Sequence, residues 1–229
     1  MSLPNIIGVS GGFGHGKDAV VSILVERFGY ERHAFADCLK LEVKRALTEL
    51  DYRDYVWNRM PVPCRDAVLT CLAVGDLDPF IKPTTPDMRS LLQLYGTEFR
   101  RAQDQDYWIQ ALFDNTAPGT RVAVSDVRFR NEADLVREKG GQVWRVLRMD
   151  AFYAYSDKTR HSSERDLDGY EFDQVIINDG TLDDLEGRVV ATLMPPAVML
   201  SALRTLPPSV LTATLRNLDA QTQGYKVQV

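Results

Sequence analysis

The stretch Gly11-Gly12-Phe13-Gly14-His15-Gly16-Lys17-Asp18 decides the fold of this chain. A short apolar run over 6–9 precedes it, and an amphipathic run over 17–28 follows it. A strand, a loop with the spacing Gly11-x4-Gly16-Lys17 and a helix together predict a phosphate-binding loop, or P-loop. The glycines let backbone N–H groups turn toward phosphate oxygens, and the helix N-terminus adds its dipole. Lys17 supplies a positive charge for the β- and γ-phosphates.

One position departs from the usual motif, because Asp18 stands where a Ser or Thr hydroxyl commonly binds Mg²⁺. A carboxylate is a hard oxygen ligand that holds Mg²⁺ directly or through water, and without a metal it would repel phosphate. Asp18 therefore indicates either a metal-dependent nucleotide site or no nucleotide at all, and the glycines and Lys17 favour the first. The second metal ligand that we expect is Asp126, at the carboxyl end of a predicted strand. A capping role in the loop after that strand is the alternative for Asp126.

Length and composition exclude several classes of protein. The chain has 229 residues, of which 45% are hydrophobic and 26% charged, as in soluble globular domains. A net charge of −5 argues against general affinity for nucleic acid. Three scattered cysteines without a C-x-x-C pair predict reduced thiols and no zinc site. No apolar run approaches the roughly 20 residues that span a membrane, and no signal peptide is evident, so we expect a cytoplasmic protein.

Strand and helix patterns alternate along the chain. Strands are predicted over 6–9, 32–35, 121–125, 142–147 and 173–177, and helices over 17–28, 37–50, 87–99, 106–113, 131–139 and 182–193. Gly29 is expected to cap the first helix at its C-terminus and Asp37 to cap the second at its N-terminus. Gly96 predicts a kink or a close approach of backbone or ligand. The alternation predicts a parallel sheet whose ligand lies at the carboxyl ends of its strands. Residues expected to meet at this rim are Gly11–Asp18, Asp37, Asp126, Arg148 and Asn178.

The pattern divides into a main domain over 1–194 and a C-terminal appendage over 195–229. Within the main domain, we interpret the proline-rich segment 51–87 as a substrate-binding insertion with one helix near 66–74. The polar segment 150–172 is predicted to be a lid, and an ordinary surface loop is the alternative. The appendage predicts two short helices, near 198–203 and 209–218, and packing or self-association into a homodimer is its expected role.

Arginines near the predicted rim suit phosphoryl transfer, since a guanidinium binds phosphate oxygens in a bidentate manner. Arg128 and Arg148 follow strands, and Arg160 lies in the predicted lid. Many arginines on any protein are solvated surface groups, which is the alternative for each of them. Trp108 is a candidate for stacking on a nucleobase, and a core position is its alternative.

Several blocks that occur in order along the chain carry a resemblance to a known family. They are Gly16-Lys17-Asp18, Phe35-Ala36-Asp37-Cys38-Leu39-Lys40, Arg89-x-Leu91-Leu92-Gln93-x-x-Gly96-Thr97-Glu98, Asp126-Val127-Arg128-Phe129-x-Asn131-Glu132 and His161-x-Ser163-Glu164. Together they resemble the deoxynucleoside monophosphate kinases of bacteriophages over residues 5–190. The animal phosphomevalonate kinases look like relatives of this group.

The resemblance implies a P-loop NTPase fold, a three-layer α/β/α arrangement with a central parallel sheet, a monophosphate-binding insertion and a lid. It implies transfer of the γ-phosphoryl group of ATP to a deoxynucleoside 5′-monophosphate, with Mg²⁺ as cofactor. Lys40, Arg89, Gln93 and Arg128 would hold the acceptor, Arg148 and Arg160 would stabilise the transferring group, and Asn178 would lie by the adenine. The full expected sets are Gly11, Gly12, Gly14, His15, Gly16, Lys17, Asp18 and Asn178 for ATP, and Asp37, Lys40, Arg89, Gln93, Trp108, Arg128 and Glu132 for the acceptor.

Two other functions compete with this one. The first is a P-loop kinase for another small phosphorylated acceptor, such as phosphomevalonate. The second is a nucleotide-binding switch without catalysis, which would normally show a water-positioning residue and partner surfaces. The number of arginines and the predicted lid favour transfer between two small phosphates. The expected partners are therefore small molecules, with neither nucleic acid nor membrane.

Overall fold

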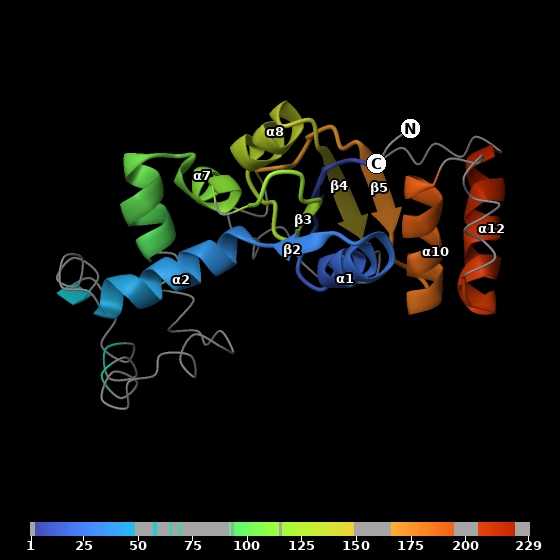
Figure 1. Cartoon of the computed structure of the whole chain (residues 1–229), viewed down its shortest axis with the longest axis horizontal. Helices are drawn as coiled ribbons and strands as arrows, with labels where there is room; N and C mark the ends of the chain where they lie inside the picture. Colours follow the sequence, from blue (N-terminus) through green and yellow to red (C-terminus); the bar gives the residue numbers. More distant parts are fainter. Residues whose placement is uncertain are drawn as a thin grey trace. The chain divides into compact units, whose positions relative to one another are not determined.

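The computed structural model describes residues 3–48, 57–58, 65, 69, 92, 94–114, 116–148, 166–194 and 206–222 (Figure 1). The chain divides into two compact units, one formed by Met1–His33 with Ala117–Val229 and the other by Ala34–Thr116. The first unit contains β1 (Ile6–Ser10), α1 (Lys17–Phe28), β2 (Glu31–His33), β3 (Val122–Val124), α8 (Arg130–Glu138), β4 (Gln142–Leu147), β5 (Gln174–Ile177), α10 (Leu182–Leu193) and α12 (Pro208–Thr222). The second contains α2 (Phe35–Thr48), the π-helix η1 (Leu94–Arg101) and α7 (Tyr107–Asp114).

The five strands form one parallel sheet in the order β2-β3-β1-β4-β5. Strand β1 lies in the middle, with β3 on one side and β4 on the other. The chain therefore changes direction across the sheet at β1, and the carboxyl end of β1 is a topological switch point. Open α/β sheets bind their ligands at such points. The predicted parallel sheet is confirmed.

One face of the sheet packs against α1 and α10. Ile7 and Val9 of β1 are fully buried in this core, together with Trp144 of β4, Leu24 of α1 and Val190 of α10. Alternation along a strand sends Ile7 and Val9 to the same face and Gly8 to the opposite one. Each buried aliphatic side chain contributes about 1.5–3 kcal/mol to folding. The strand that leads into the P-loop is therefore firmly anchored.

The other face of the sheet is covered by α8. A Cβ atom added at Gly8 would lie 2.9 Å from Cγ2 of Val127 and 3.4 Å from Cγ2 of Val136, so only glycine allows this close approach. Helices on both faces of the sheet give three layers, as expected from the sequence. Helix α12 packs beside α10 (Figure 1), where a Cβ atom at Gly187 would meet Ala213 at 2.7 Å.

The second unit is organised around the carboxylate of Glu42 on α2. It accepts hydrogen bonds from the hydroxyl groups of Tyr95 (2.9 Å) and Tyr107 (2.7 Å), and it forms an ion pair with Arg100. Burial raises the pKa of Tyr95, and the neighbouring Glu42 raises it further, so this hydroxyl stays protonated as a donor. A Cβ atom at Gly96 would lie 3.0 Å from Cδ2 of Leu39, so a side chain approaches this glycine closely, rather than the predicted backbone or ligand.

Most predicted elements agree with the structure, with one correction and three helices that cannot be compared in full. Gly29 adopts a left-handed conformation (φ 66°) at the end of α1, as predicted. Asp37 is wrong as an N-cap, because the buried Phe35 already begins α2 and Asp37 lies in its first turn. The helices predicted near 66–74 and 198–203 and the start of the helix at 87 fall mainly or wholly outside the described residues. In the part of the chain that the structure describes, no helix combines the length and apolarity needed to cross a bilayer.

Candidate active site

The loop between β1 and α1 has the backbone of an anion-binding turn. Gly14 (φ 75°) and Gly16 (φ 94°) adopt left-handed conformations that favour glycine. The amide of His15 donates to the carbonyl of Gly12 at 3.3 Å, and the amide of Val20 donates to the carbonyl of Gly16 at 3.1 Å, where the helix starts. The first turn of a helix leaves N–H groups without intrahelical acceptors, and these groups attract anions.

The ammonium group of Lys17 lies across the mouth of this loop. Its Nζ donates to the carbonyl oxygen of Gly12 at 2.8 Å. Lys17 also lines a pocket in the first unit with other residues of the loop, of β4 and of the segments around Val127 and Leu167. The lining residues are Ser10, Gly11, Gly12, Phe13, Lys17, Val127, Arg128, Arg145 and Leu167. Three cationic side chains thus border one pocket, as polyphosphate binding requires.

Arg145 is a candidate site residue that the sequence analysis did not identify. It lies in β4, in register with Ser10 of β1, and its Nη1 donates to Oγ of Ser10 at 3.2 Å. Its guanidinium also stacks 5.3 Å from the ring centre of Phe172. These contacts fix the guanidinium on the pocket side of the sheet. The available signal was a single charged residue inside the otherwise apolar run 143–147 of β4.

The His15 side chain supports the loop and does not face its mouth. The ring is only 5% exposed, and its Nδ1 lies 3.2 Å from the carbonyl oxygen of Val146. A Cβ atom at Gly12 would lie 2.9 Å from Nε2 of this ring. The imidazole therefore packs against the loop backbone, and any contact of position 15 with ATP would come from its backbone.

The two expected metal ligands lie on neighbouring parts of the first unit. Asp18 is in the first turn of α1, and Asp126 follows β3, the strand that pairs with β1. The next amide, of Val127, donates to the carbonyl of Val9 at 3.2 Å and thereby holds this segment at the end of β1. No group of three or more potential metal ligands occurs among the described residues. Mg²⁺ in kinase sites needs only one or two carboxylates, because phosphates and waters complete its shell.

Two sequence expectations for substrate contacts require correction. Glu132 is 2% exposed, and its Oε2 accepts from the amides of Arg128 (2.7 Å) and Phe129 (3.0 Å), so it caps α8. Trp108 is 3% exposed and donates its indole N–H to the carbonyl of Gly96 at 3.1 Å, which is a core position. Neither side chain is available for a substrate in this structure.

Asn178 follows β5, and its expected place by the adenine stays a prediction. Its side-chain Nδ2 donates to the carbonyl of His15 at 3.0 Å, so this amide is bonded to the loop itself. Arg128 and Arg148 are exposed, the first at the pocket and the second after β4. Lys40 and Asp37 are half-buried on α2 in the other unit. Arg89, Gln93, Arg160 and most of the predicted lid lie outside the described residues.

The fold is a three-layer α/β arrangement around a parallel sheet, with a glycine-rich loop between β1 and α1. A family model described as deoxynucleotide monophosphate kinase matches residues 81–189. A protein of Acanthamoeba polyphaga mimivirus named "Putative deoxynucleotide monophosphate kinase" is 29% identical over 210 aligned positions, which cover 81% of this chain and 94% of that protein. The chain is thus similar to the deoxynucleotide monophosphate kinase family, and this likeness supports a phosphotransferase of the nucleoside monophosphate kinase kind.

Two solved structures overlap most of the chain at low TM-scores. One is a sugar kinase from Janibacter sp. HTCC2649, with 16% identity, 84% of this chain and 96% of that chain covered, and a TM-score of 0.38. The other is TT1252 of Thermus thermophilus, with 20% identity, 85% and 100% covered, and a TM-score of 0.36. TM-scores this low show neither a shared fold nor a shared substrate.

Proposed function

We propose that this protein transfers the γ-phosphoryl group of ATP to a deoxynucleoside 5′-monophosphate and so forms the diphosphate and ADP. An oxygen of the acceptor phosphate forms a bond to the γ-phosphorus, and the bond from the γ-phosphorus to the β–γ bridging oxygen breaks. The electron pair of that bond leaves with ADP. The sequence blocks and the family match support the acceptor class, and the loop before α1 supports ATP as the donor.

The donor phosphates belong in the loop Gly11–Gly16. The inward backbone N–H groups would bind the β-phosphate, and the dipole of α1 would add to the attraction. Lys17 would exchange the neutral carbonyl of Gly12 for a charged phosphate oxygen. Hydrogen bonds to a charged acceptor are shorter and stronger, so this exchange is favourable.

The transferring group needs positive charge on its three equatorial oxygens. Arg128 and Arg145 border the pocket in front of Lys17 and are the guanidinium groups that we assign to it, with Arg148 and Arg160 as further candidates. Lys40, Arg89 and Gln93 stay as proposed acceptor contacts. Arg145 is held by Ser10 and Phe172 before any substrate arrives, and such preorganisation strengthens its effect on the transition state.

The residues present also fit a magnesium ion. Asp18 and Asp126 offer hard oxygen ligands near the mouth of the loop, and a set of two carboxylates is what Mg²⁺ takes when phosphates supply other ligands. When bound there, Mg²⁺ neutralises charge on the β- and γ-phosphates. Asp18 is then compatible with bound phosphate, although it replaces the usual hydroxyl.

No general base is required for the proposed reaction. The second pKa of a phosphate monoester is about 6, so the acceptor is mostly a dianion at neutral pH and attacks without losing a proton. Catalysis is then a matter of holding two anionic groups in line and screening their repulsion. A site built from a lysine, several arginines and backbone N–H groups suits this task.

The observation that carries the proposal is the placing of Lys17, Arg128 and Arg145 around one pocket at the carboxyl end of β1. The matched family region, 81–189, contains Arg128 and Arg145 but not Lys17 or the loop, so only the loop supports the proposal independently of the family match. A coupled assay of ADP release tests the proposal over the four deoxynucleoside monophosphates, the ribonucleoside monophosphates and phosphomevalonate. Turnover with a deoxynucleoside monophosphate supports it, and turnover with phosphomevalonate alone would identify another acceptor. Tight ATP binding without turnover would indicate a switch.

A further inference from the structure

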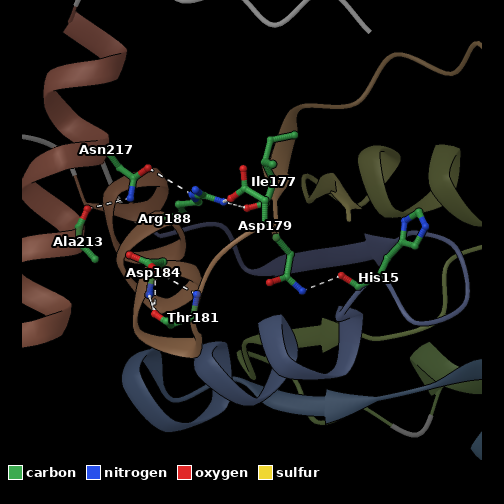
Figure 2. Close-up of polar contacts among 9 residues, drawn as sticks. His15, Ile177, Asp179, Thr181, Asp184, Arg188, Ala213 and Asn217 are labelled. Carbon is green, nitrogen blue, oxygen red and sulfur yellow. Dashed lines mark hydrogen bonds and ion pairs between the residues drawn. The ribbon is translucent and has the colours of Figure 1, made fainter. Parts of the chain in front are cut away.

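The turn after β5 contacts the phosphate-binding loop directly. Nδ2 of Asn178 donates to the carbonyl oxygen of His15 at 3.0 Å, drawn as a dashed line to His15 in Figure 2. The backbone amide of Asn178 donates to the carbonyl of Leu147 at 2.7 Å and extends the β4–β5 pairing. A Cβ atom at Gly16 would lie 2.3 Å from the same Nδ2. The amide of Asn178 therefore occupies the space that Gly16 leaves and bonds the residue before it.

Arg188 of α10 holds this turn from the other side. Its Nη1 forms an ion pair with Asp179 at 2.5 Å and donates to the carbonyl of Ile177 (Figure 2). Thr181 and Asp184 form a capping box at the start of α10. The backbone amide of Thr181 donates to Oδ2 of Asp184 at 3.0 Å, and the backbone amide of Asp184 donates to Oγ1 of Thr181 at 3.2 Å. The residues on both sides of Asn178 are thus fixed to α10.

Arg188 also connects the turn to α12. Its Nε donates to Oδ1 of Asn217 at 3.4 Å, and Nδ2 of Asn217 donates to the carbonyl of Ala213 at 2.8 Å (Figure 2). The close approach of Ala213 to Gly187 brings the two helices together here. Helix α12, for which the sequence suggested only packing or self-association, therefore lies against the residue that holds the turn.

We propose that Asn178 is a positioning residue for the phosphate-binding loop, and that Arg188, supported by α12, keeps Asn178 in place. This inference rests on the proposed function, because the loop is the expected ATP site. Four of the six residues in Gly11–Gly16 are glycine, which loses more conformational freedom on ordering than any other residue. A side-chain bond that exists before the ligand arrives lowers the ordering cost of binding.

The first test measures the loop without nucleotide. Asn178→Asp keeps the shape of the side chain but replaces the donor with an oxygen that faces the carbonyl of His15. In Asn178→Asp and Asn178→Ala, amide hydrogen exchange over residues 13–18 should accelerate by about tenfold, while exchange in β1 and β4 stays unchanged. Asn217→Ala should accelerate amide hydrogen exchange over the same residues, but by a smaller factor. Arg216→Ala removes an exposed arginine from α12 and is the matched control, expected to change nothing.

The second test measures ATP binding by calorimetry in the full-length protein, below the unfolding temperature of each variant. The dissociation constant of Mg-ATP should rise about tenfold in Asn178→Ala, the factor that corresponds to one such hydrogen bond. A variant that only lost global stability would not change this constant. Wild-type exchange and wild-type affinity in both Asn178 variants would overturn the inference and leave the proposed function standing. Accelerated exchange in a protein whose wild type binds no ATP would support the positioning role and refute the proposed function.

Discussion

The ammonium group of Lys17 lies 2.8 Å from the carbonyl oxygen of Gly12, folded back over the loop from which its helix starts. The contact keeps a positive charge at the mouth of the pocket that Arg128 and Arg145 also line. A phosphate that enters this mouth offers Lys17 a charged acceptor in place of a neutral one. Under the proposed function, Lys17 would exchange this carbonyl for a phosphate oxygen.

Lys17→Ala should give a folded protein with very little activity. Lys17 has no role in the hydrophobic core, and the loss of one electrostatic group from such a site costs on the order of 10²-fold or more in rate. Turnover and circular dichroism measure the two effects separately. Lys139→Ala, at the exposed end of α8, is the matched control and should behave as wild type. A Lys17→Ala protein with wild-type turnover would refute the assignment of the loop.

Arg145→Ala should lower kcat/KM by about 10²-fold, and by more than Arg148→Ala does. The reason is position, since Arg145 borders the pocket while Arg148 lies exposed beyond the end of β4. Arg145→Lys should recover only part of the loss, because an ammonium group cannot bind phosphate through two parallel hydrogen bonds. Steady-state kinetics measure kcat/KM for the three variants. If kcat/KM fell in Arg148→Ala and not in Arg145→Ala, Arg148 rather than Arg145 would be the arginine that stabilises the transferring group.

Asp126→Asn should raise the magnesium concentration needed for half-maximal rate more than it raises KM for the acceptor. A neutral amide oxygen is a weaker ligand for a hard divalent cation than a carboxylate. The measurement is a magnesium titration of the rate at saturating nucleotide, with Asp114→Asn, an exposed position at the end of α7, as control. Activity that persists in excess chelator would refute the metal roles of both Asp18 and Asp126.

Glu132→Ala should lower the free energy of unfolding by about 1–2 kcal/mol, because two backbone amides at the start of α8 lose their acceptor. Glu132→Gln keeps an acceptor oxygen and should lose less. Denaturant unfolding checks both values. If Glu132 instead bound the acceptor nucleotide, Glu132→Gln would raise the KM of the acceptor and leave stability unchanged.

Much of the fold could be predicted from local sequence pattern. The strand over Gln142–Leu147 and the helix over Leu182–Leu193 have clear apolar patterns and were predicted with their observed bounds. The loop Gly11–Asp18 could be predicted because its functional residues are contiguous. Asp37 was assigned as a cap because the sequence alone does not reveal that Phe35 is already buried at the start of α2.

The residues of the site that come from different elements were harder to predict. Arg145 reaches the pocket only because the register of β4 places it beside Ser10, and that register is a property of the sheet. Trp108 was assigned to substrate as an aromatic residue near the rim, and Glu132 as part of a block of the resemblance, whereas the burial of both depends on tertiary packing. Asn178 was placed near the correct loop, but its hydrogen bond to His15 could not be predicted.

The transfer itself is measured most directly with ATP labelled in its γ-phosphoryl group, incubated with Mg²⁺ and each of the four deoxynucleoside monophosphates in turn. Chromatography then separates labelled nucleoside diphosphate from labelled inorganic phosphate. We predict that label appears in the diphosphate of at least one deoxynucleotide, and that Lys17→Ala abolishes this product. Label that stays in ATP, or that appears only as inorganic phosphate with all four acceptors, would contradict the account.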